Sequence, residues 1–317
     1  MSLRYHIQKG MCFKSPFQIY SGTNLPMKFN RKLQSGLTFA IVFATISLTA
    51  CSMRVMYNYL DWVIPWYMDD YVTLTDQQDT SFDYSTIQFL RWHRAEELPR
   101  YEEFVVSFKD AQTNPMSQRQ VLLFFDDIWT LWDALIMESM PYLLELSADL
   151  SEKQLQQIND ALVSDIEKLR KKHGNRSEIQ RRENWRNKMT DAVDDWLGVA
   201  TDEQVELIRL WSETRNNTTD DWLEYRDNWR KKFMELLYNQ QSIDYIDEMS
   251  TFLLNPQKMY SASYHKAVTE NRHHFAQFLA DLSTTFTALQ RQHFQDKLAE
   301  IIDDIRDLTD QGKILQS

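Results

Sequence analysis

The segment from Leu90 to Tyr101 holds the densest group of chemically active side chains in this sequence. If the segment is helical, His93 and Glu97 lie one turn apart on the same face. The pair could then bind a divalent metal ion, or Glu97 could raise the pKa of the imidazole for acid/base catalysis. One histidine and one carboxylate are too few for a zinc site, and no second histidine has ligand spacing to His93.

Three hypotheses for this segment follow. We favour a structural one, in which a buried network of ion pairs locks the helix beneath the aromatic residues that precede it. A patch that contacts a ligand is the second hypothesis, and catalysis is the third. The candidate binding patch consists of Trp62, Trp66, Trp92, His93, Arg94, Glu97 and Arg100.

Motifs of the common enzyme classes are missing from the sequence. His265, His273 and His274 fall on one expected helix, but His265 is about two turns from the other two, too far to share an ion. The sequence has no glycine-rich phosphate loop, no nucleophile with a plausible base and no calcium loop. We therefore predict a non-enzymatic protein without a cofactor or a metal. The alternative is an envelope hydrolase or metal-dependent enzyme centred on His93 and Glu97.

A run of basic side chains stands out in an otherwise acidic sequence. Residues 168 to 188 carry nine lysines and arginines against Glu178 and Glu183, and Gly174 is expected to turn the chain between two helices. The run then forms the tip of a helical hairpin, which is either solvated or in contact with lipid phosphate, lipopolysaccharide or an acidic partner. The candidate tip residues are Lys171, Lys172, Arg176, Arg181 and Arg182.

Residues 27 to 51 have the three parts of a bacterial signal peptide. Three basic side chains precede an uncharged apolar stretch at residues 37–50, which at about 14 residues is shorter than the roughly 20 that a membrane-spanning helix needs. The stretch ends in Leu48-Thr49-Ala50-Cys51, which resembles a bacterial lipobox. The resemblance implies that Cys51 receives a diacylglyceryl group and becomes the N-terminus after cleavage.

The lipobox resemblance also implies a location for the protein in the cell. Ser52 follows the cysteine where an aspartate would favour the inner membrane, so the lipid anchor is expected in the outer membrane, with the domain on its periplasmic face. Residues 1–26 precede the signal peptide and are interpreted as a gene-model extension, with Met27 as the start. An ordinary signal peptide cleaved nearby, or a short signal anchor, is the alternative.

Removal of the signal peptide changes the composition. Cys12 lies in the leader, so a chain that begins at Cys51 cannot form an internal disulfide. Residues 1–50 contain six of the 35 basic side chains and none of the 46 acidic ones, which leaves 29 against 46 and a net charge of −17. Such a chain is not expected to bind nucleic acid. The expected partners are the membrane, through the lipid, and an envelope protein.

An aromatic stretch follows the lipid attachment residue. It runs from Tyr57 to Tyr71 and holds two tryptophans, four tyrosines and three aspartates. Tryptophan and tyrosine favour the water–bilayer boundary, whereas the carboxylates of Asp61, Asp69 and Asp70 oppose it. We favour a short arm at residues 51–73, packed into a groove of the domain that follows.

Residues 74–317 are expected to form an all-α domain. Only three glycines and five prolines follow Cys51, and apolar residues recur at spacings of three and four. One such stripe contains Val121, Phe124, Ile128, Leu131 and Leu135. The pattern predicts an elongated bundle of about seven to nine helices, built partly from repeated hairpins.

Four short boxes support this organisation, each with a hydroxyl residue three positions before a glutamine. They begin at Thr75, Ser151, Thr201 and Thr287, and the second and third are 50 residues apart, as in a weak internal repeat. Each is a capping box, in which the hydroxyl and the glutamine satisfy amide groups at a helix start. The boxes resemble the Leu-Thr-x-x-Gln motif of the Spy and CpxP periplasmic stress proteins, some of which are ATP-independent chaperones.

The aromatic stretch and the segment from Leu90 to Tyr101 together resemble a group of uncharacterised gammaproteobacterial lipoproteins with a domain of unknown function. That resemblance implies no activity. From both resemblances and the missing enzyme motifs, we expect a cell-envelope lipoprotein that acts by binding, scaffolding or chaperone-like contact.

Overall fold

The computed structural model describes residues 52–316, so the signal peptide and Cys51 lie outside the described residues. Every regular element in the described part is helical, which confirms the predicted all-α, multi-helix bundle. The described helices belong to one compact unit. None of them is both long enough and apolar enough to cross a membrane.

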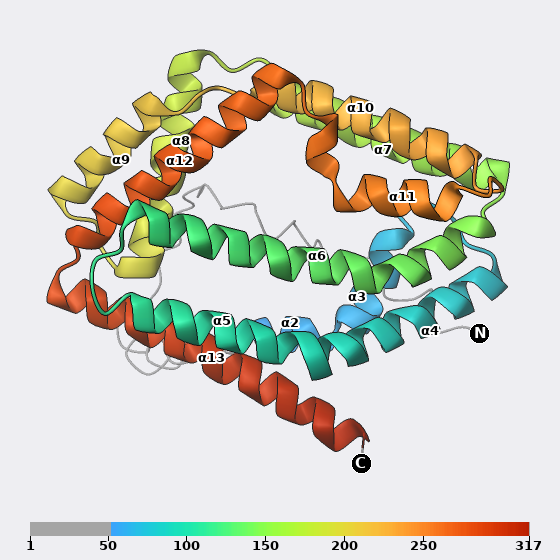
Figure 1. Ribbon diagram of the computed structural model, residues 1–317, viewed down its shortest axis with the longest axis horizontal. Helices are drawn as coiled ribbons and strands as arrows, with labels where there is room; N and C mark the ends of the chain where they lie inside the picture. Colours follow the sequence, from blue (N-terminus) through green and yellow to red (C-terminus); the bar gives the residue numbers. More distant parts are fainter. Residues whose placement is uncertain (1–51, 317) are drawn as a thin grey trace, which may run out of the picture. The chain divides into compact units, whose positions relative to one another are not determined.

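Short connections join most of the helices (Figure 1). The elements are α2 (Ser52–Asn58), α3 (Leu60–Met68), α4 (Asp76–Trp92), the π-helical turn η1 (His93–Glu97), α5 (Leu98–Ala111), α6 (Gln118–Ala148), α7 (Glu152–His173), α8 (Glu178–Leu197), α9 (Asp202–Thr214), α10 (Thr219–Tyr238), α11 (Tyr245–Leu254), the 3-10 turn η2 (Pro256–Met259), α12 (Ala262–Thr284) and α13 (Ala288–Gln316).

Capping boxes fix where the helices begin. At each of the four expected boxes the glutamine amide donates its backbone N–H to the hydroxyl, and the glutamine side-chain oxygen accepts the backbone N–H of the cap residue. Two further boxes, at Ser117 and Ser177, start α6 and α8 in the same way. Each cap contributes about 1 kcal/mol to helix stability.

The four expected boxes also pair with one another. Gln204 and Gln290 exchange two side-chain hydrogen bonds of 2.9 Å, and the amide of Gln290 also donates to the carbonyl of Val199. Gln78 and Gln154 meet in the same way, with a bond of 2.6 Å from Gln154 to Gln78. All four side chains are buried. Each pair therefore ties together two helix starts that lie far apart in the sequence.

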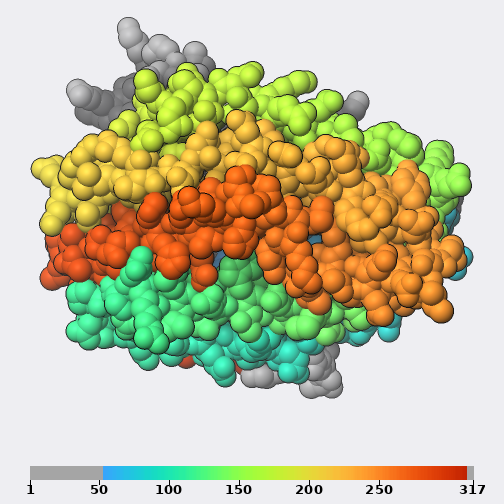
Figure 2. All heavy atoms as spheres, turned by 45° about the horizontal axis from the view of Figure 1, so that its top comes forward, coloured from blue at the N-terminus to red at the C-terminus, as the bar shows by residue number. Residues whose placement is uncertain are grey.

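The two box pairs mark an internal duplication. Helices α3 and α4 form a hairpin that ends in one pair, and α8 and α9 form its counterpart; α4 packs on α6 as α9 packs on α12. Helices α6 and α12 lie side by side (Figures 1 and 2). The first half is α3 to α7 and the second half is α8 to α13. The two halves interlock, because α5 of the first packs on α13 of the second, and α10 of the second packs on α7 of the first. The fold thus matches the Thr75 box with the Thr201 box, not the two boxes 50 residues apart.

Separate apolar cores lie beside these contacts. One joins Val72, Leu150 and Leu155 to residues of α10 and α11, and another joins Val193 and Ile208 to α12. A smaller core places Leu98 of α5 against α13. The apolar core is therefore divided into separate clusters, and the long helices also carry exposed apolar side chains that belong to none of them.

Candidate functional site

His93 lies in the π-helical turn between α4 and α5 and is surrounded by aromatic rings. The ring centroids of Tyr57, Phe89, Trp92 and Tyr101 lie 5.6, 6.2, 6.3 and 5.3 Å from that of the imidazole. A hydrogen bond of 2.8 Å joins the Tyr57 hydroxyl to Nδ1 of His93. Pro99, which has no backbone N–H to donate, follows the turn and favours the local departure from α-helical geometry.

Burial controls the protonation of this cluster. Burial, and after it the charge of Arg94, lowers the pKa of His93 to about 4. Burial and the carboxylate of Glu97 raise the pKa of Tyr101 to about 12. His93 is therefore neutral at pH 7, the reverse of the raised imidazole pKa that the acid/base hypothesis requires.

Glu97 has a different partner from His93. Its side chain is fully buried, and both carboxylate oxygens accept hydrogen bonds from one guanidinium nitrogen of Arg100, at 3.1 and 2.7 Å. Since Arg100 occupies Glu97 and Tyr57 occupies Nδ1 of His93, the geometry gives no support to a hydrolytic or metal site centred on the two. In the part of the chain that the structure describes, no group of three or more histidine, cysteine, aspartate or glutamate side chains could hold a metal ion.

The cluster holds helix α2 against the bundle. Arg94 lies over the ring of Tyr57, 5.0 Å from its centroid, and donates to the side chain of Asn58. Arg54 forms an ion pair of 2.6 Å with Asp304 of α13. The chemistry of this cluster is that of a structural lock between α2, the π-helical turn and α13.

The structure brings together only part of the candidate binding patch. Trp92, His93 and Arg94 share the cluster, and Glu97, at the end of the same π-helical turn, pairs with Arg100 of α5. Trp62 and Trp66 are not among the rings that meet His93; they stack on each other on the exposed side of α3, with centroids 6.1 Å apart. Sequence reasoning missed Tyr57, Phe89 and Tyr101, although the first belongs to the aromatic stretch that was singled out.

Because of His93, we expect the free energy of unfolding to decrease as the pH falls from about 6.5 to about 4. The unfolded histidine takes up a proton near pKa 6.5, whereas the folded one stays neutral down to about 4. The unfolded state therefore binds more protons throughout this window, and about 2.5 kcal/mol of the free energy of unfolding is lost by about pH 4.5. Urea titrations at about pH 7 and about pH 4.5 measure the loss.

His93→Gln is the control for this pH effect. Glutamine keeps a polar partner for Tyr57 but does not titrate, so the variant should lose about 2.5 kcal/mol less than the wild type between the two pH values. Equal losses in both proteins would show that His93 is not the group responsible.

The predicted basic tip lies at the junction of α7 and α8, and it divides into two sets. The expected hairpin does not form there, because α7 packs on α10 whereas α8 packs on α9 and α13. Arg181 and Arg182 both pair with Glu178, at 3.5 and 2.8 Å. Among the described residues, Lys171, Lys172 and Arg176 have no ion-pair partner, and together with Gln180 and Asn184 they line an open depression of about 500 Å³. The unpaired cations would attract an anionic group, but no buried polar side chain shapes a site for one.

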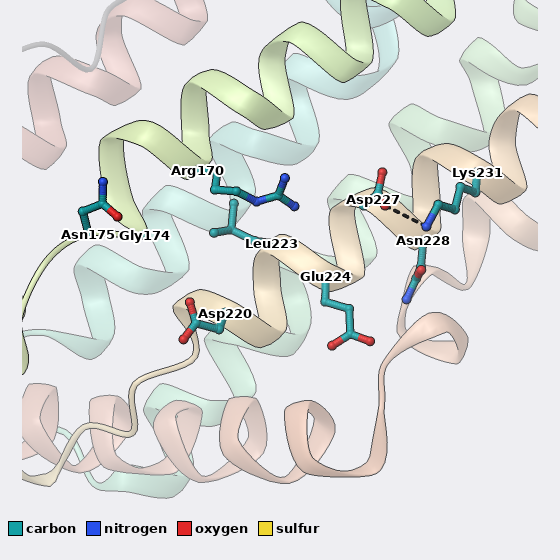
Figure 3. Close-up of a pocket in the computed structure, with 9 residues that line it drawn as sticks. All are labelled: Arg170, Gly174, Asn175, Asp220, Leu223, Glu224, Asp227, Asn228 and Lys231. Carbon is teal, nitrogen blue, oxygen red and sulfur yellow. Dashed lines mark ion pairs between the residues drawn. The ribbon is translucent and has the colours of Figure 1, made fainter.

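A second depression, of about 470 Å³, lies between α7 and α10 (Figure 3). Arg170 of α7 and Asp220 and Glu224 of α10 line it, and Asp227 and Lys231 form an ion pair of 2.8 Å at its edge. Its wall carries charges of both signs and neither a histidine nor a cysteine. No hydroxyl or thiol side chain lines it, and its mixed charges select no single ligand charge.

A third candidate surface is an exposed apolar side of α6. Between Val121 and Met140, which are both buried, 18 consecutive residues include no buried side chain, although 12 of them are apolar. Trp129 and Trp132 are 54% and 49% exposed, and Ile128 is 50% exposed. Ile128, Trp132 and Leu143 fall on one side of the helix, about 60° apart at most, because successive residues turn by about 100°.

Contacts near both ends hold α6 against the bundle. At the N-terminal end Phe125 stacks on Phe275 of α12, and Arg272 of α12 pairs with Asp126. At the C-terminal end the hydroxyl of Tyr245 in α11 donates to Ser147. Between these contacts, one side of α6 presents exposed apolar side chains, among them Ile128, Trp129 and Trp132, together with acidic residues. Folding normally covers such a surface, so we regard it as a candidate contact site.

Comparison with known proteins yields one match. Residues 70–265 match the model of a family of unknown function, DUF6279. The chain belongs to the DUF6279 family. No curated protein and no solved structure matches it. The matched region contains the whole of α6 and the box pair of Gln78 and Gln154, so both features lie within the part that defines this DUF6279 protein.

Proposed function

We propose that this DUF6279 protein is a lipid-anchored protein of the bacterial cell envelope that binds apolar polypeptide segments without catalysing a reaction. Its anchor is the lipid at Cys51, in the outer membrane, and the helical unit faces the periplasm. The lipobox resemblance supports the anchor.

The exposed middle of α6 is the observation that carries the binding function. A partner that covers Ile128, Trp129 and Trp132 removes three large half-exposed side chains from water, and full burial of one such side chain contributes about 1.5–3 kcal/mol. Tryptophan is also the residue type most enriched among those that dominate binding energy. An apolar helix or an extended apolar segment laid along α6 fits this surface.

The charge of α6 selects among apolar partners. Its unburied stretch carries Asp126, Asp127, Asp133 and Glu138 and no basic residue. Only Asp126 has an ion pair among those that the structure describes for this stretch, to Arg272. Complementary charge guides association and discriminates against like-charged partners. The preferred partner is therefore both apolar and basic, as amphipathic segments of secreted or unfolded proteins often are.

The capping boxes add support from resemblance. Four boxes of the Spy and CpxP type start helices here, and their glutamines pair across the fold. The Spy and CpxP family forms thin helical structures, and some of its members act as ATP-independent chaperones. A similar activity in this protein would use α6 as the binding surface.

Substitution of the α6 tryptophans tests the proposal. The chain with Cys51→Ala, purified as a soluble protein, should suppress aggregation of an unrelated denatured protein at near-stoichiometric amounts without ATP. Trp129→Ser with Trp132→Ser should weaken that suppression at least about tenfold, since each lost anchor costs on the order of 1 kcal/mol or more. Light scattering measures the suppression.

Trp62→Ser with Trp66→Ser is the matched control. These tryptophans are 53% and 46% exposed, almost the same as the α6 pair, but they lie on α3. The control should suppress aggregation as the wild type does, and circular dichroism should show that both variants keep their helices. The proposal is rejected if the wild-type protein does not suppress aggregation at several-fold excess. It is also rejected if the α6 and α3 variants suppress aggregation equally.

A further inference from the structure

Helices α2 and α3 present an exposed apolar face directly after Cys51. Val55 and Met56 lie on α2, Tyr59 lies at the junction of the two helices, and Trp62 and Trp66 lie one turn apart on the same side of α3. All five are between 46% and 60% exposed. The rings of Trp62 and Trp66 are stacked nearly parallel, which extends the face as a flat aromatic surface.

The opposite side of the same segment is fixed to the bundle. Met53 and Tyr57 pack against the core between α5 and α13, and Met68 packs against the core that contains Val72. Pro65 is buried, and Arg54 pairs with Asp304 of α13. The segment therefore cannot roll over to hide its aromatic side, and the direction in which that side points is set by the fold.

The aspartates of the segment do not lie on the aromatic face. Asp61 is about 100° from Trp62 and about 140° from Trp66 around the helix axis, because successive residues turn by about 100°. Asp69 caps the C-terminal end of α3, and Asp70 follows it in the turn. From the sequence these carboxylates were expected to oppose contact with a membrane; in the fold they leave the exposed face without a charge.

We infer that the exposed face of α2 and α3 lies in the water–bilayer boundary, as a second contact with the membrane that holds the lipid at Cys51. The inference rests on the proposed lipid anchor. Tryptophan and tyrosine favour this boundary because each combines an apolar ring with a polar group. Val55 is four residues after Cys51 in the sequence and Trp66 is fifteen, so the whole face lies within reach of the anchored surface.

Charge favours zwitterionic lipid as the surface that this face contacts. The chain from Cys51 onward has a net charge of −17, which repels anionic surfaces, whereas the face itself is uncharged. Contact through uncharged aromatic and aliphatic side chains should therefore form on phosphatidylcholine and be insensitive to salt. With two points of attachment the bundle has a fixed orientation on the membrane, and α6 is held at a constant position relative to it.

Fluorescence quenching tests the inference on the whole lipidated protein. The protein is reconstituted into phosphatidylcholine vesicles with brominated acyl chains, which quench tryptophans at the bilayer boundary. Trp62→Phe with Trp66→Phe removes two of the ten tryptophans but should abolish most of the lipid-quenched emission. Trp129→Phe with Trp132→Phe removes the same number and should leave that emission intact.

The outcomes separate the inference from the anchor. Cys51→Ala should abolish palmitate labelling in cells; labelling that persists would refute the anchor, and with it the inference that depends on it. If the wild type is labelled but Trp62 and Trp66 are not quenched by lipid, the inference alone fails. If these tryptophans are protected from aqueous iodide but are not quenched by lipid, another protein surface covers the face. That result would also overturn the inferred membrane contact.

Discussion

Gln204→Glu is expected to lower the free energy of unfolding by about 3–5 kcal/mol. The side-chain oxygen of Gln204 accepts the amide N–H of Thr201 at 3.0 Å and the side-chain N–H of Gln290 at 2.9 Å. Its side-chain nitrogen donates to Gln290 and to the hydroxyl of Thr285. Glutamate keeps the acceptor but replaces the donor with a second oxygen, and it places a charge in a fully buried position. Urea unfolding followed at about 222 nm measures the loss.

Gln120→Glu and Gln180→Glu are the matched controls for this prediction. Both glutamines complete capping boxes, but both are exposed and cap only their own helices. Glutamate serves an isolated capping box as well as glutamine does, so these variants should stay within about 0.5 kcal/mol of the wild type. Equal losses at paired and unpaired boxes would show that pairing contributes nothing.

The contrast shows what the sequence could predict about the fold. A capping box is local, so the hydroxyl and the glutamine three residues later were enough to identify four helix starts. The partner of each paired glutamine lies elsewhere in the chain, and no local pattern indicates that Gln204 meets Gln290 or that Gln78 meets Gln154. The duplication was missed for the same reason: the spacing of 50 residues linked Ser151 with Thr201, whereas the three-dimensional pairing matches Thr75 with Thr201.

Apolar periodicity predicted α6 correctly but not its surroundings. The stripe through Val121, Phe124 and Ile128 identifies a helix, and such a stripe usually faces a core. Of these three, only Val121 is buried; Phe124 is half-buried and Ile128 is exposed, although α4, α5, α11 and α12 all contact α6. Burial depends on which helices pack together, and periodicity carries no information about that.

The segment around His93 shows the same limit for the candidate site. The sequence placed His93 and Glu97 on one helical face, which assumes α-helical geometry. The structure has a π-helical turn over these residues, and the two side chains take different partners, Tyr57 and Arg100. A change in local helix type redirects side chains that spacing alone would put together.

Arg100→Met should be about as destabilising as Gln204→Glu, by about 3–5 kcal/mol. Glu97 is fully buried, and its two oxygens accept bonds of 3.1 and 2.7 Å from Arg100. Removal of the guanidinium leaves a buried carboxylate without its counter-charge, and the loss of a single partner from a buried ion pair costs more than the loss of both. Urea unfolding at about pH 7 measures the change.

Two further variants decide whether the unpaired carboxylate is the cause. Arg91→Met removes an exposed arginine from the last turn of α4 and should change stability by less than about 0.5 kcal/mol. Glu97→Gln combined with Arg100→Met removes both charges and should recover most of the lost stability, since no charge is then left buried without a partner. If the double variant is as unstable as Arg100→Met alone, the aliphatic stem of Arg100, not its charge, stabilises the turn that holds His93 in place.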